Sequence, residues 1–139
     1  MAEDEIKFID YDFKLPVHAN ELSKAEEVLD KLKDKITLIK STKSINDKIH
    51  TKLFDEIIRV LDYVGQLSVS AFNVAEEMER MYTMQYLQQP ALGKKLWLDH
   101  YEHIHHPYTI LKNRCFRMLD DLDDEFIRRF KRKPPNWKI

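Results

Sequence analysis

The sequence predicts an all-α protein: an antiparallel helical bundle of three long or four shorter helices with coiled-coil-like heptad packing. Two observations lead to this fold class. Only 2 glycines occur in 139 residues, whereas tight turns between strands depend on residues that accept positive φ angles, chiefly glycine. Apolar residues also recur at alternating intervals of three and four over most of the chain, which is typical of amphipathic helices. At this length we expect one such bundle with its own core.

The chain divides into three parts. We expect residues 1–20 to form an extended N-terminal arm, residues 21–133 the helical bundle and residues 134–139 a short C-terminal tail. The arm carries an apolar and aromatic segment, and no second strand candidate exists to pair with it. We therefore expect this segment to lie on the bundle; its residues are Phe8, Ile9, Tyr11, Phe13 and Leu15.

The first helix is expected from about Asn20 to Ser41. Either Asn20 or Ser23 can cap its N-terminus, and Ser23 with Glu26 forms an S-x-x-E capping box. Charged residues occupy most of its surface, and one stripe is apolar, as in a helix with a single buried side. The apolar residues are Leu22, Ala25, Leu29, Leu32, Ile36 and Ile39.

A long second helix is expected from about Ser44 to Gln88, with Ser44 and Asp47 as its capping residues. From Ile57 onward, the apolar residues keep a spacing of three and four without a miss, which strongly indicates a helix with one continuous apolar line. The full apolar line of this helix is Ile45, Ile49, Leu53, Ile57, Val60, Val64, Leu67, Ala71, Val74, Met78 and Met81.

Pro90 ends the second helix, because the residue before a proline avoids the α region. A third helix then runs from about Ala91 to Lys131. Pro107 lies inside it and lacks a backbone donor, so either the helix kinks or two helices meet near His106. One face carries Leu92, Leu96, His100, Ile104, Tyr108, Leu111, Cys115, Met118, Leu122 and Phe126.

The expected helices are unequal in length. The second and third would each be roughly 60 Å long at 1.5 Å per residue, and the first would cover only about half of either. We therefore expect another copy of the chain or a partner to cover the remainder.

Composition and motifs exclude several classes of protein. Gly65 and Gly93 have no glycine nearby, so P-loop and Rossmann fingerprints are absent. Cys115 is the only cysteine, which suits a reducing cytoplasmic setting. It lies on the apolar face, so we expect an inert thiol and no enzymatic activity. The N-terminus is acidic and the longest uncharged run, from Tyr63 to Ala75, is too short to cross a bilayer. We therefore expect neither a secretory signal nor a membrane span.

A cluster of histidines and carboxylates before Pro107 is one candidate site. Glu102 and His105 match the Glu-x-x-His element of di-iron bundles, in which helices present metal ligands one turn apart. Only one such element occurs, so the competing interpretation is a polar surface turn around a helix kink. The candidate ligands of a divalent metal are Asp99, Glu102, His103 and His106.

The basic C-terminal segment is a second candidate site. Six basic residues and no acidic one follow Glu125. Lys and Arg side chains neutralise phosphates and aromatic rings stack on bases, so the segment could bind nucleic acid or an acidic partner. Alternatively, it complements the helix dipole and pairs with the acidic residues one turn earlier. The candidate binding residues are Arg128, Arg129, Lys131, Arg132, Lys133 and Trp137.

Small residues in the uncharged part of the second helix form a third candidate. Their short side chains let another helix approach closely, either inside the bundle or from a second copy. The candidate self-association residues are Gly65, Ser68, Ala71 and Ala75.

Sustained heptads, unequal helices and the lack of a catalytic motif predict a non-enzymatic interaction or accessory protein. We expect it to self-associate or to dock onto a protein partner in a larger assembly, without a cofactor and away from membranes. Two alternatives remain open. One is a nucleic-acid-binding accessory protein that uses the basic segment, and the other is a metal-binding helical protein that uses the cluster from Asp99 to His106.

Overall fold

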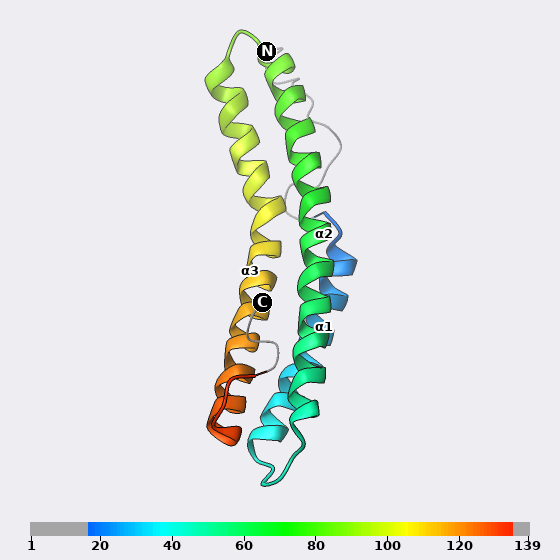
Figure 1. Cartoon of the computed structure of the whole chain (residues 1–139). Coiled ribbons are helices and arrows are strands. Elements are labelled where there is room, and N and C mark those ends of the chain that lie inside the picture. The colour runs from blue at the N-terminus through cyan, green and yellow to red at the C-terminus, as the bar shows by residue number, and fades with distance from the viewer. Residues whose placement is uncertain (1–16, 135–139) are drawn as a thin grey trace.

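The computed structural model describes residues 17–134, which form three α-helices and no strand (Figure 1). The helices are α1 (Ala19–Lys40), α2 (Asp47–Gln85) and α3 (Pro90–Phe130). The all-α fold class is therefore confirmed, and residues 17–134 contain three helices rather than four shorter ones. The apolar segment predicted for the arm, and Trp137 of the tail, lie outside the described residues.

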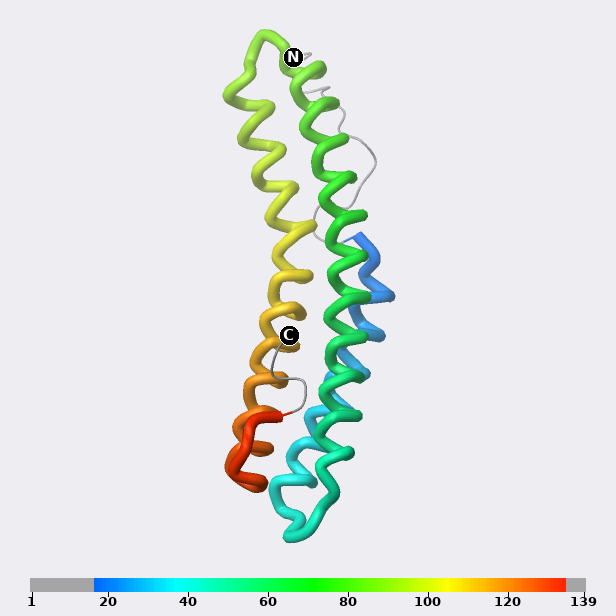
Figure 2. Tube along the Cα trace, viewed as in Figure 1, coloured from blue at the N-terminus to red at the C-terminus, as the bar shows by residue number. Residues whose placement is uncertain are grey.

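The two longer helices run antiparallel and side by side, and the shorter α1 lies along only one end of them (Figures 1 and 2). α2 and α3 share the largest set of contacts, whereas α1 touches each of them less extensively. The start of α1 lies beside the middle of α2, where His18 Nε2 is 3.2 Å from Ser70 Oγ. We call residues 71–107, which include the loop between the two helices, the distal half of the α2–α3 pair. Residues 47–70 and 108–130 are the proximal half.

The start of α1 differs from the prediction. Its N-cap is His18, which has a left-handed backbone (φ 60°) and makes no side-chain capping bond. Capping by Asn20 or Ser23 is therefore wrong, as is the box of Ser23 and Glu26, because all three residues lie inside the helix. The helix starts earlier because the carbonyl of His18 already accepts a helical hydrogen bond.

The start of α2 also differs from the prediction. Asn46 is its N-cap, and its side-chain oxygen accepts the Lys48 N–H at 2.9 Å. The predicted cap Ser44 lies before the helix, and Asp47 occupies the first helical position. Asparagine caps a helix as well as serine does, and a carboxylate in the first turn complements the positive end of the helix dipole.

The buried face of α1 agrees with the predicted apolar line at every position, from Leu22 to Ile39. In α2 the predicted line is buried from Leu53 to Val64 and again at Ala71 and Met78, but Ile49 is exposed and three later positions also depart from the prediction. The predicted positions Leu67 and Val74 are only partly buried, and Met81 is exposed. The side chains buried in their place are Ser68, Ala75 and Tyr82.

The physical reason for this shift is the short α1. Glu56 of α2 points toward α1, since its carboxylate lies 4.0 Å from Lys35 Nζ. Leu67 and Val74 each follow Glu56 by close to a whole number of helical turns, which returns them to the same side of the helix. α1 begins beside Ser70, at about the level of Leu67. It does not reach Val74 or Met81, so only the side of α2 that faces α3 stays buried there.

α3 is one continuous helix through Pro107. The alternative of two helices that meet near His106 is therefore wrong. A search of residues 17–134 finds no helix with the length and apolar character that a membrane span requires.

The two glycines provide a matched test of helix packing. A Cβ at Gly93 would lie 3.1 Å from the Tyr82 carbonyl oxygen, whereas a Cβ at Gly65 would meet nothing within 4 Å. Alanine is favoured over glycine in a helix by about 1 kcal/mol. We expect Gly65→Ala to raise the free energy of unfolding by about that amount, and Gly93→Ala to raise it less or to lower it. Urea unfolding measures both, and equal gains would contradict the close approach at Gly93.

Candidate interaction surfaces

One buried carboxylate holds the proximal end together. The Glu125 side chain is 3% exposed and accepts hydrogen bonds from the guanidinium groups of Arg128 and Arg129. Arg129 also donates to the carbonyls of Ile39, at 2.8 Å, and Lys43, at 3.0 Å. These carbonyls belong to the last turn of α1 and to the loop after it. Arg129 therefore connects α3 to α1 and to the α1–α2 loop.

Other residues of the basic segment lie near the same end. Arg132 pairs with Asp47 at 2.6 Å, and its guanidinium lies 5.0 Å from the centroid of the Phe126 ring. Lys131 is the C-cap of α3 and is exposed, as is Lys133. Three of the candidate arginines thus have acidic partners within the chain, which reduces the positive charge that they offer to a ligand. Binding of nucleic acid by this segment remains a prediction.

His50 is buried beside this cluster, between two aromatic rings. Its ring centroid lies 5.3 Å from that of Phe126 and 5.6 Å from that of Phe130, both edge-on. Neither ring nitrogen has a hydrogen-bond partner among the described residues. Burial lowers the pKa of His50 below 6.5, although the nearby Glu125 carboxylate raises it. The imidazole is therefore neutral in the folded protein at neutral pH.

The candidate metal ligands lie on the solvent side of α3, where all four are exposed: Asp99, Glu102, His103 and His106. In the part of the chain that the structure describes, no group of three or more His, Cys, Asp or Glu side chains is arranged to hold a metal ion. The intervening histidines are turned elsewhere, since His100 is buried near the Tyr82 ring and His105 stacks on Tyr101. Metal binding at this cluster remains a prediction.

Cys115 is fully buried in the core. Burial raises the pKa of its thiol to about 11, and the weaker effect of Arg114 only partly opposes this. The thiol is therefore protonated at neutral pH, and it is not available as a nucleophile.

The small residues of α2 fall mostly inside the chain. Ser68, Ala71 and Ala75 are buried, and the indole N–H of Trp97 in α3 donates to the Ala75 carbonyl at 2.6 Å. Gly65 is partly buried. Short side chains here let α3 pack closely. This agrees with the alternative in which the small residues pack against another helix of the same chain. Self-association through these residues remains a prediction.

The distal half of the α2–α3 pair carries exposed apolar side chains. α1 starts below it because the buried Tyr108 hydroxyl donates to the Val17 carbonyl and fixes the chain just before the helix. No third described helix therefore covers the pair beyond this point (Figure 1). The exposed large apolar residues of this half are Phe72, Met81, Met84, Leu87, Leu92 and Leu98.

An aromatic cluster on α3 is a feature that the sequence analysis missed. Tyr101 and His105 stack with ring centroids 4.2 Å apart, and Trp97 lies 5.4 Å from Tyr101. Phe72 of α2 packs edge-on against both Tyr101 and His105. The spacing of Trp97, Tyr101 and His105 by four residues was the signal, because residues four apart share a helix face.

No protein-family model, curated protein or solved structure matches this chain.

Removal of the Arg129 side chain tests the proximal cluster. Arg129→Ala breaks a nearly buried pair and leaves the Ile39 carbonyl without this donor. We expect a loss of about 3 kcal/mol in the free energy of unfolding. The matched control is Arg128→Ala, whose side chain is 62% exposed and should contribute less than about 1 kcal/mol. Equal losses in denaturant unfolding would show that Arg129 has no special role.

The buried His50 predicts a stability that depends on pH. Its folded pKa is lower than the unfolded value of 6.5, so the unfolded chain binds the proton first. Stability should be complete above about pH 6.5 and fall below it, with a slope of at most about 1.4 kcal/mol per pH unit for each such histidine.

We expect His50→Phe to make this slope shallower in unfolding experiments between pH 7 and pH 5. Leu38→Phe, at an exposed position, changes no titratable group and should leave the slope unchanged. A slope that His50→Phe does not alter would assign the pH dependence to other groups.

Proposed function

We propose that this chain is a non-enzymatic interaction protein that self-associates through apolar helix surfaces left uncovered by its own α1. The observation that carries the proposal is the mismatch in helix length: α1 has 22 residues, and α2 and α3 have 39 and 41. The distal half consequently has two described helices where the proximal half has three.

The chemistry of the distal half supports this proposal. Its exposed side chains include Phe72, Leu92 and Leu98, and transfer of such apolar surface out of water is favourable. Contiguous apolar surface on a soluble protein commonly marks an interaction site. We propose that helices of a second copy pack there with the heptad spacing of the sequence, as in a coiled coil.

Two alternatives are kept as separate hypotheses. A nucleic-acid-binding role would depend on the basic segment from Arg128 to the C-terminus, and a metal-binding role on the cluster from Asp99 to His106. The distal half is favoured over both of these sites. The arginines of the basic segment already have acidic partners within the chain, and the candidate metal ligands are exposed to solvent on α3.

The mass of the protein in solution tests the proposal. We expect light scattering on a sizing column to give a discrete multiple of the mass of one chain, and a proportion of that species that rises with concentration. Leu98→Glu, at an exposed position of the distal half, should shift the equilibrium toward smaller species without loss of helical circular dichroism. A species with the mass of a single chain at every concentration would contradict self-association.

A further inference from the structure

A second stripe runs along α3 beside its buried face. Its members are spaced four, three, four, seven, four and seven residues apart, so they lie within about 60° of one another at 100° per residue. Leu98 and Phe116 are its most exposed apolar side chains, at 46% and 53%. The outer stripe, as we name it, consists of Lys94, Leu98, Tyr101, His105, Lys112, Phe116 and Asp123.

The outer stripe points away from α1. Arg114 and Asp121 mark the side of α3 that faces α1, since they pair with Asp30 at 2.5 Å and Lys40 at 2.8 Å. Their positions lie roughly half a turn around α3 from the stripe at 100° per residue. α2 packs beside the stripe, where Phe72 meets Tyr101, but it leaves Leu98 and Phe116 exposed.

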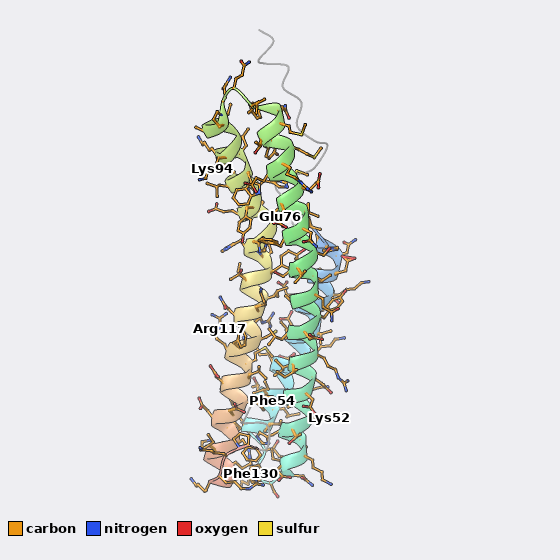
Figure 3. All side chains as sticks on the ribbon, turned by 45° about the horizontal axis from the view of Figure 1, so that its top comes forward. Lys52, Phe54, Glu76, Lys94, Arg117 and Phe130 are labelled. Atoms are coloured by element: carbon orange, nitrogen blue, oxygen red, sulfur yellow. The ribbon has the colours of Figure 1, made fainter. Side chains whose placement is uncertain are left out.

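Opposite charges occupy the two ends of the outer stripe. Lys94 and Lys95 lie at the distal end of α3, and Figure 3 shows Lys94 far along the helix from Phe130. Asp123 lies at the proximal end with Asp120 beside it, and no ion pair within residues 17–134 involves any of these four side chains. Lys94 and Asp123 are separated by about 44 Å along the helix, so they cannot meet within one chain.

The sequence of the stripe is complementary to itself when reversed. If two α3 helices lie antiparallel with Lys94 opposite Asp123, the same register places Tyr101 opposite Phe116. His105 and Lys112, at the centre of the stripe, contact Phe72 and Ser68 of α2 and add no complementary charge. A two-fold axis repeats each pairing twice, because in a symmetric interface residue i meets residue j and j meets i. A parallel arrangement would instead bring lysine to lysine and aspartate to aspartate.

We propose that a second copy of this chain docks antiparallel on the outer stripe of α3, with Lys94 of each copy beside Asp123 of the other and Tyr101 beside Phe116. This inference rests on the self-association proposed above and adds the surface and the direction of contact. Complementary charges at the two ends set the orientation. The aromatic and apolar side chains between them supply the buried area.

The acidic end supports this arrangement independently. Burial and the neighbouring carboxylates of Asp120 and Asp124 raise the pKa of Asp123. The isolated chain therefore holds carboxylates that repel one another. A cation from a second copy would relieve this repulsion.

A charge exchange tests both the surface and the orientation. We expect Lys94→Glu and Asp123→Lys each to weaken dimerisation about tenfold, because each change acts twice in a symmetric dimer. The double variant K94E/D123K should recover the dimer, since it restores both pairs with reversed sign. Sedimentation equilibrium measures the dissociation constants, and circular dichroism checks that each variant folds. Lys31→Glu on the exposed surface of α1 is the matched control for a change of net charge.

Asp123 is half-buried, so the exposed pair Lys95 and Asp120 provides a second exchange, K95E/D120K. If neither set of variants changes the dissociation constant of the dimer, this inference is overturned and self-association still stands. Single variants that weaken the dimer without recovery in the double would overturn the antiparallel register. A wild-type protein that stays monomeric would overturn both this inference and self-association. In that case, a different protein whose binding is lost in the Phe116→Asp variant would be the occupant of the stripe.

Discussion

The apolar contact between α2 and α3 is the constraint on which the rest of the molecule depends. The two helices have 39 and 41 residues and run side by side along nearly their whole length (Figure 2). Buried side chains line the contact between them. In the distal half this contact is the only one between described helices. It is centred there on Met78, Tyr82 and Tyr86, with Leu96 and Trp97 packed against them. Helices of this kind derive most of their stability from such packing rather than from helix propensity.

The position of α1 follows from two polar anchors at its ends. The Tyr108 hydroxyl holds the Val17 carbonyl at one end, and Arg129 holds the Ile39 carbonyl at the other. Both donors belong to α3, so the register of α1 against α3 is specified by hydrogen bonds as well as by apolar packing. Because α1 fits between these anchors, α2 and α3 are the only described helices in the distal half.

The functional proposals follow from the sides of α2 and α3 that remain uncovered. On α2, the short α1 leaves Met81 exposed where a longer helix would bury it. On α3, the outer stripe carries apolar residues between ends of opposite charge, which is a pattern that a second copy can satisfy by itself. The candidate basic segment has a different character, because its arginines help to close the proximal end.

The sequence alone determined the fold class, the approximate extent of the three helices and the whole buried face of α1. Periodicity carries this information because a helix face is a local property. Only the tertiary structure decided that Val74 and Met81 lose their burial, since this depends on how far α1 extends. The tertiary structure also decided the roles of Arg129 and His50. Their partners, Ile39 for Arg129 and Phe126 for His50, lie on other helices, and no spacing along the chain reports contacts between segments so distant in sequence.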